Sequence, residues 1–214
     1  MTTIEPAGVA EVLAILGHGE PEPPVAQTAA VIARLAGGQA GDAGAAPAPR
    51  DFRRAGQRRT VATVVAARRA AVGKAGRADP APRIRRVLLP LDGTTGSASA
   101  IADTAERLAR SGAELVVLHV FDARTVPKFW DQHAHAGQAW GQEFLARYCA
   151  LPRARLELRS GAAAEHVVKV AGAEQADMIA LAWSQRLEPG RALVVRRAVR
   201  DAGVPVMLVP MPAN

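Results

Sequence analysis

The strongest constraint on the fold is a regular alternation between short apolar runs and segments of helical period, which begins near residue 87 and continues along the chain. Each run is rich in β-branched or aliphatic side chains, and enough chain for one helix follows it. This order predicts crossover units, in which consecutive strands run parallel and helices cover both faces. We therefore expect an α/β fold with a doubly wound, mainly parallel sheet of five strands, at 87–91, 115–121, 156–158, 178–182 and 206–209.

The runs differ in how much of each strand they predict to be buried. The second is apolar except for His119, so it should be a central strand covered on both faces. The third alternates charged and apolar side chains over 155–159, so it should lie at an edge. The segment between them carries an aromatic stripe at helical spacing, which we interpret as core packing: Trp140, Phe144 and Tyr148.

The first third of the chain differs in composition, since Ala, Gly, Pro and Arg dominate it and large apolar side chains are few. Apolar spacing predicts short amphipathic helices at 6–16 and 24–36. The following stretch should be a flexible basic linker with at most one short helix, at 60–72. The chain thus divides into a helical N-terminal extension of low complexity, a linker and a core domain, at 1–36, 37–82 and 83–212.

The positive charge is concentrated in one segment. The formal net charge is +7, but residues 50–86 alone hold 12 basic residues against Asp51 and Asp79, and the chain from 87 onward is nearly neutral. Such a segment can bind nucleic acid or an anionic surface by attraction and counterion release. We interpret it as a solvated linker and keep the nucleic-acid or membrane-surface adaptor as an alternative.

Several chemistries find no support in the sequence. Cys149 is the only cysteine, which excludes an intramolecular disulfide and CxxC chemistry. Asp131, His133 and His135 are too few ligands for a structural zinc, so we expect no metal. No apolar run approaches the roughly 18 residues that span a bilayer, and no basic stretch followed by an apolar one marks the N-terminus. We expect a cytoplasmic protein without a membrane span.

The loop after the first strand is a candidate ligand site. It carries a carboxylate at Asp92, a flexible Gly93 and a hydroxyl at Thr94, and we expect Ser97 to cap the helix that follows. Ligands of doubly wound sheets bind beyond the carboxyl ends of the strands, where such groups meet helix N-terminal amides. The buried stripe of that helix should comprise Ile101, Ala105 and Leu108.

Several segments occur in the order and approximate spacing of the universal stress protein (UspA-like) family: PLDGT, SGAELVVLHV, a stretch centred on Gly161, ADMIALA and VPVMLVP. The chain resembles this family over residues 84–210. The resemblance implies an adenine-nucleotide alpha-hydrolase-like fold, and in many members an ATP site whose first two elements match Asp92 and Val120. It also implies a homodimer through the last strand, whose exposed edge would need covering, at Val206, Met207, Leu208 and Val209.

The third element of that ATP site, a signature of the form G-x2-G-x9-G-[ST], is absent. Ala182 and Gln185 stand at the paired glycines, and Ala192 and Leu193 stand at the later Gly-[ST]. Glycines let main-chain amides approach phosphate oxygens, whereas a methyl group or a Gln side chain crowds a triphosphate. ATP is therefore disfavoured, and we expect no cofactor.

The residues that replace this glycine loop allow two interpretations. Trp183 can stack on a planar ligand while Ser184, Gln185 and Arg191 recognise an anion or a carbonyl. Alternatively, Trp183 fills the vacated pocket and the arginines are solvated, which is the interpretation that we favour.

These features predict a non-enzymatic regulatory or stress-response protein of the cytoplasm, which acts through dimerisation and contact with a partner that the sequence does not identify. One alternative is a nucleotide-binding protein that uses Asp92 with the modified loop at 182–193. The other is the adaptor tethered by residues 50–86.

Overall fold

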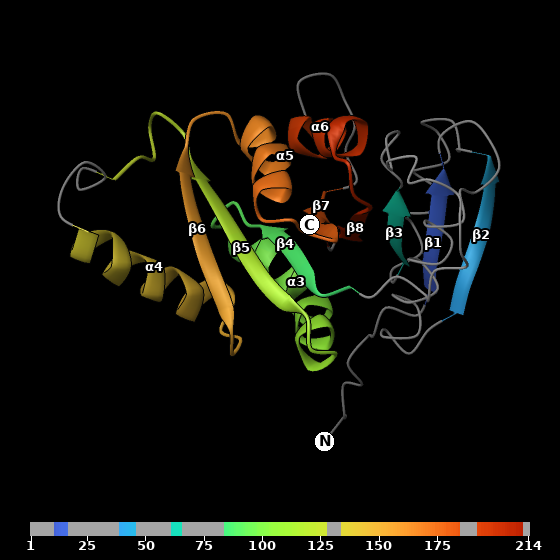
Figure 1. The fold of residues 1–214 in the computed structure, drawn as a ribbon, viewed down its shortest axis with the longest axis horizontal. Helices are drawn as coiled ribbons and strands as arrows, with labels where there is room; N and C mark the ends of the chain where they lie inside the picture. The colour runs from blue at the N-terminus through green and yellow to red at the C-terminus, as the bar shows by residue number, and fades with distance from the viewer. Residues whose placement is uncertain are drawn as a thin grey trace.

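The computed structural model describes residues 84–127, 134–184 and 192–211, together with the backbone of three N-terminal strands, β1 (Glu11–Leu16), β2 (Gln39–Ala45) and β3 (Val61–Val65) (Figure 1). The predicted helix at 24–36, most of the basic segment 50–86 and the residues Asp131, His133, Gln185 and Arg191 lie outside this description.

Strands and helices alternate from residue 86 onward, as predicted. The elements are β4 (Arg86–Pro90), α3 (Thr95–Arg110), β5 (Glu114–Phe121), α4 (Ala134–Tyr148), β6 (Ala154–Ser160), α5 (Ala163–Ala173), β7 (Met178–Trp183), α6 (Leu193–Asp201) and β8 (Val206–Pro210). All five predicted strands are present: β4 is shifted by one residue toward the N-terminus, and the other four extend one or two residues beyond one or both ends of the predicted run.

The five strands form a parallel sheet in the order β8-β7-β4-β5-β6. β5 is internal and β6 lies at the edge, which confirms both predictions. Figure 1 shows α5 and α6 above the sheet and α3 and α4 below it. Alternate residues of each strand therefore enter two cores: Leu115 and Val117 face the α3 side, whereas Val116 and Leu118 face the α5 side.

The order of the strands fixes where a ligand can enter. The chain leaves β4 toward β5 and β6, and then returns to the other side of β4 to form β7 and β8. The strand order thus reverses at the border between β4 and β7, and a crevice opens beyond the carboxyl ends of strands at such a point.

Helix α3 begins earlier than the sequence predicts. Thr94, rather than Ser97, is the N-cap: its backbone is extended and its side chain accepts a hydrogen bond from the backbone N of Ser97 at 3.2 Å. Asp92 causes the shift, because its carboxylate holds both the amide and the hydroxyl of Thr94. The predicted buried stripe of α3 is confirmed, since Ile101, Ala105 and Leu108 are each at most 2% exposed.

The N-terminal strands differ from the sequence-based expectation. β1 lies where the end of the 6–16 helix was expected, and β3 lies where the 60–72 helix was expected. β2 and β3 also place strands within the stretch interpreted as a linker. Short apolar runs fit helix and strand equally well when periodicity alone is considered, so pairing decides between them. β1 pairs in parallel with both β2 and β3.

The last strand does not present an open edge. β3 pairs with β8 in antiparallel fashion, with Thr63 opposite Leu208 and Val65 opposite Val206, while β7 occupies the other edge. The expected dimer through Val206 to Val209 rested on an unpaired edge, and that premise is wrong in this structure. A strand has only two edges, so a second copy would have to displace β3.

Candidate functional site

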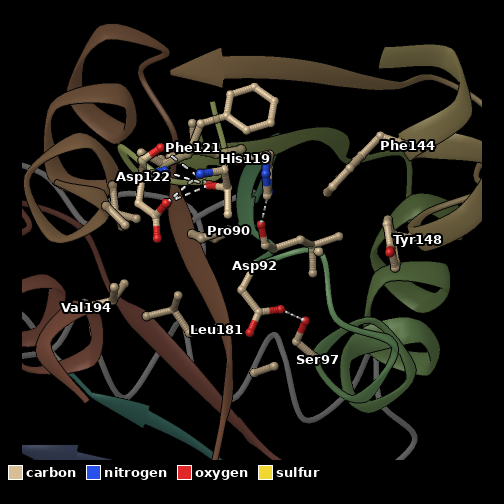
Figure 2. A pocket seen from close by; sticks show the side chains of 18 of the residues that line it. Pro90, Asp92, Ser97, His119, Phe121, Asp122, Phe144, Tyr148, Leu181 and Val194 are labelled. Atoms are coloured by element: carbon tan, nitrogen blue, oxygen red, sulfur yellow. Dashed lines mark hydrogen bonds between the residues drawn. The ribbon is translucent and has the colours of Figure 1, made fainter. Parts of the chain in front are cut away.

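A pocket of about 640 Å³ opens beyond the carboxyl ends of β4, β5 and β7 (Figure 2). Residues of α3, α4, α5 and α6, and of the segments that follow β5, β6 and β8, also line it. It therefore lies at the reversal of strand order, where the fold favours ligand binding. The described residues contain no group of three or more His, Cys, Asp or Glu side chains arranged to hold a metal ion.

Asp92 is held at the floor of this pocket by the start of α3. Its Oδ1 accepts hydrogen bonds from the amide of Thr94 at 2.9 Å, from the Thr94 hydroxyl at 2.8 Å and from the Ser97 hydroxyl. Burial by itself raises the pKa of Asp92, but the hydrogen bonds from Ser97 and Thr94 together outweigh it and hold the pKa below its ordinary value. Asp92 is therefore ionised near neutral pH.

A second carboxylate, Asp122, lines the pocket immediately after β5. Its Oδ1 accepts from the amides of Arg124 and Thr125, both at 2.8 Å, and from the Thr125 hydroxyl at 3.0 Å. These hydrogen bonds lower the pKa of Asp122, so it is also ionised. The sequence analysis missed this residue. Its signal was a carboxylate that directly follows a buried strand, with a threonine three residues later.

Aromatic side chains from β5 and α4 form another wall of the pocket. Trp140 and Phe144 stack with ring centroids 5.0 Å apart, and Tyr148 continues the row with its centroid 4.8 Å from that of Phe144. Phe144 belongs to the hydrophobic core, as predicted for the aromatic stripe. Trp140 and Tyr148 pack against that core only in part and also line the pocket.

His119 joins this wall to the loop that carries Asp92. Its Nδ1 lies 2.9 Å from the carbonyl oxygen of Leu91, so Nδ1 is the protonated nitrogen that donates. The ring centroid lies 4.7 Å from that of Phe144. Gly93 makes room for it: φ is +80° there, and a Cβ would lie 3.3 Å from the His119 ring. Glycine is thus required on both conformational and steric grounds.

The structure brings together only part of the site expected from the sequence. Of the residues expected at the site, Asp92, Gly93, Val120 and Ala182 line the pocket. Thr94 instead caps α3. Trp183 is 4% exposed and packs in the core on the α5 and α6 side, so it neither lines the pocket nor fills it. Ser184 is exposed, and Ala192 is the N-cap of α6 with φ of +53°.

The sequence profile of the universal stress protein family matches residues 83–210. The chain belongs to this family. The match spans β4 to β8 and hence all of the elements that build the pocket. No protein of curated function shows a significant match.

The chain is also similar to several solved structures. A universal stress protein in complex with cAMP is 19% identical, with 60% of this chain and 98% of that chain covered, at a TM-score of 0.47. UspA from Lactobacillus plantarum is 20% identical, with 61% and 99% covered and a TM-score of 0.42. A protein of unknown function from Pseudomonas aeruginosa PAO1 is 12% identical, with 96% and 94% covered and a TM-score of 0.50.

Two further observations bear on the sequence-based expectations. Within the described part of the chain, no helix combines the length and the apolar character needed to cross a bilayer. The left-handed backbone at Ala192 is one that glycine adopts without strain, and it occurs where the sequence comparison places a family glycine. Residues 185–191 lie outside the description, so the loss of the glycine loop stays a prediction.

Proposed function

We propose that this family member is a non-enzymatic regulatory protein of the cytoplasm, which binds a small ligand in the pocket beyond β4, β5 and β7 and acts by contacting a partner. We further propose that ATP is not its physiological ligand. One observation carries both statements: two ionised carboxylates line the pocket, and no Lys or Arg is found among its described lining residues.

Charge argues against a triphosphate in this pocket. A polyphosphate bound near Asp92 and Asp122 meets two like charges, which repel it. Phosphate sites normally offset this repulsion with Arg or Lys side chains or with glycine-loop amides. The described part of the lining offers only helix N-terminal ends, through Ser97 of α3, Ala163 of α5 and Val194 of α6.

The start of α6 gives a second reason. Ala192 carries a methyl group at the N-cap and makes no side-chain capping bond. The next residue, Leu193, is 61% exposed and has no hydroxyl to donate to a phosphate. Both features favour weak binding of ATP.

The polar groups of the pocket favour binding over catalysis. The Ser97 hydroxyl donates to Asp92, and the His119 ring donates through Nδ1 to the Leu91 carbonyl. In a Ser-His nucleophile pair, the histidine accepts the proton of the serine hydroxyl. The serine and the histidine are instead held in separate bonds that shape the loop after β4.

The test is calorimetry with Mg-ATP on the full chain and on a quadruple variant, Ala182→Gly, Gln185→Gly, Ala192→Gly and Leu193→Ser. Each charge-assisted amide contact is worth about 1.5 to 3 kcal/mol, so the loss of two such contacts should make the natural chain bind about two to four decades more weakly than the variant. Ala150→Gly, which adds a glycine away from the pocket, is the control and should leave binding unchanged. Micromolar binding of Mg-ATP by the natural chain would refute the proposal.

A further inference from the structure

The carboxylates of the pocket offer hydrogen-bond acceptors to a ligand. All three bonds to Asp92 fall on Oδ1, and so do all three bonds to Asp122. No hydrogen bond from another described residue falls on Oδ2 of either carboxylate, so its lone pairs can serve a ligand. Figure 2 shows one oxygen of Asp92 bonded to Ser97 and the other pointing away from it. Two strong acceptors are therefore available from the polar side of the pocket.

His119 adds a third acceptor from a buried position. The residue is 7% exposed, lines the pocket and uses Nδ1 to donate to Leu91. In the neutral ring the other nitrogen, Nε2, is then an acceptor. It makes no hydrogen bond within the part of the chain that the structure describes. A ligand that donates hydrogen bonds satisfies this nitrogen.

The aromatic wall provides the matching apolar surface. Phe144 and Phe121 are 4% and 2% exposed and contact Trp140, with centroids 5.0 and 4.8 Å from the Trp140 ring. Trp140 and Tyr148 are only half-buried, so part of each ring faces the pocket. Because the supporting rings are packed, this surface is preformed for a flat ring.

The N-termini of α3, α5 and α6 lie at the pocket and act in the opposite direction, since helix N-termini favour anions. Each is equivalent to about half a positive charge. At α3 the Thr94 side chain already accepts from the Ser97 amide, which leaves less of that end for a ligand. Arg124 follows Asp122 closely, but its side chain is exposed and is not part of the lining. Two full negative charges therefore dominate the described pocket.

We propose that this pocket binds a small aromatic amine, with its flat ring against Trp140 and Tyr148 and its cationic nitrogen at Asp92 and Asp122. The proposal rests on the proposed function in one respect, namely that this pocket is the ligand site. It adds the chemical class of the ligand: an aromatic ring, a positive charge and N–H donors.

The test uses three indole probes of matched shape and different charge: tryptamine, which is cationic, tryptophol, which is neutral, and indole-3-acetate, which is anionic. Binding to the full chain is followed by NMR titration at low and at high salt. Tryptamine should bind about tenfold more tightly than tryptophol at low salt, and high salt should reduce this advantage. Indole-3-acetate should be the weakest of the three.

Two variants separate the roles of charge and ring. Asp122→Asn keeps an oxygen for the loop amides. It should weaken the binding of tryptamine by about three- to tenfold and change the binding of tryptophol by no more than about twofold. Trp140→Ala should weaken the binding of tryptamine and of tryptophol alike by about tenfold. Trp140→Phe, which keeps an aromatic ring, should retain most of the affinity. Thermal melts of each variant show whether the fold is retained.

The outcomes are distinct. Absence of tryptamine binding, or equal or tighter binding of tryptophol or indole-3-acetate, overturns the inference about the ligand class and leaves the weak binding of ATP untouched. Tight binding of Mg-ATP by the natural chain instead contradicts the proposed function. The inference is supported if affinity falls from tryptamine to tryptophol to indole-3-acetate and Asp122→Asn reduces these differences.

Discussion

Carboxylates at the two ends of the sheet have different kinds of hydrogen-bond partners. At the amino end, the Glu114 carboxylate accepts a hydrogen bond from Arg86 Nε at 2.8 Å on one oxygen and from Arg155 Nε at 2.9 Å on the other. Arg155 also pairs with Glu174 and Glu157. At the carboxyl end, Asp92 and Asp122 accept hydrogen bonds from amides and hydroxyls of the described residues.

We interpret the charges at the amino end as structural and those at the carboxyl end as groups that bind a ligand. The arginine network at the amino end joins the starts of β4, β5 and β6, so its charges are used within the protein. The carboxylates at the other end are ionised but keep one oxygen each for an incoming group. Substitutions at the amino end should therefore change stability, whereas charge substitutions at the pocket should change binding.

The largest expected effect concerns the ring that supports the pocket wall. Phe144 is 4% exposed and contacts the rings of His119, Trp140 and Tyr148. Phe144→Ala should lower the free energy of unfolding by about 3 to 5 kcal/mol, measured by urea denaturation. Phe144→Leu, which retains most of the volume, should cost clearly less. A loss below about 1 kcal/mol for the alanine variant would show that this wall is not part of the core.

The next effect lies at the amino end. Asp177 Oδ2 accepts from the backbone N of Arg85 at 2.7 Å and of Arg86 at 2.9 Å, which ties the start of β4 to the turn before β7. Asp177→Ala should lower the free energy of unfolding by about 1 to 2 kcal/mol, because both amides lose a charged acceptor. Asp103→Ala on the exposed face of α3 is the matched control and should stay within about 0.5 kcal/mol. Equal losses for the two variants would contradict the structural role.

A smaller effect should appear in the pH dependence of stability. Hydrogen bonds from Arg155 and Arg86 lower the pKa of Glu114 in the folded protein. The unfolded chain then binds protons more readily, so this stabilisation is complete above the ordinary pKa and is lost as pH falls through the lowered folded value. Asp92 contributes in the same direction.

Stability should therefore be level from about pH 7 to 5 and should decline below about pH 4. Glu114→Gln should make the decline shallower by less than about 1 kcal/mol, because the pair is partly exposed and screened by solvent. Thermal melts across this range provide the measurement. A natural chain whose stability rises on acidification would contradict the sign of the effect.

The smallest effect concerns the backbone beside the pocket. Ala192 and Ala162 are both helix N-caps without a side-chain capping bond, but Ala192 has φ of +53° whereas Ala162 has φ of −77°. Ala192→Gly should stabilise the chain by about 0.5 to 1 kcal/mol more than Ala162→Gly does, because only the first relieves a left-handed alanine. Equal changes in the two melts would show that the capping position alone is responsible.

Much of the fold could be predicted because its signals are local. The alternation of apolar runs and helical segments predicted β4 to β8, and the charge pattern of 155–159 predicted β6 at the edge. Asp92 was found because it follows a strand and opens a helix. The first cap was misassigned, since the hydrogen bonds from Thr94 to Asp92 depend on the folded turn.

The sequence by itself determined the class of fold, the family and one carboxylate of the pocket, because periodicity, strand ends and motif order are properties of neighbouring residues. Only the tertiary structure decided which strand ends meet. It placed Asp122 and His119 in the same pocket as Asp92, packed Trp183 in the core on the α5 and α6 side, and covered β8 with β3. These outcomes depend on strand order and on pairing between distant segments, for which no single stretch of sequence carries a signal.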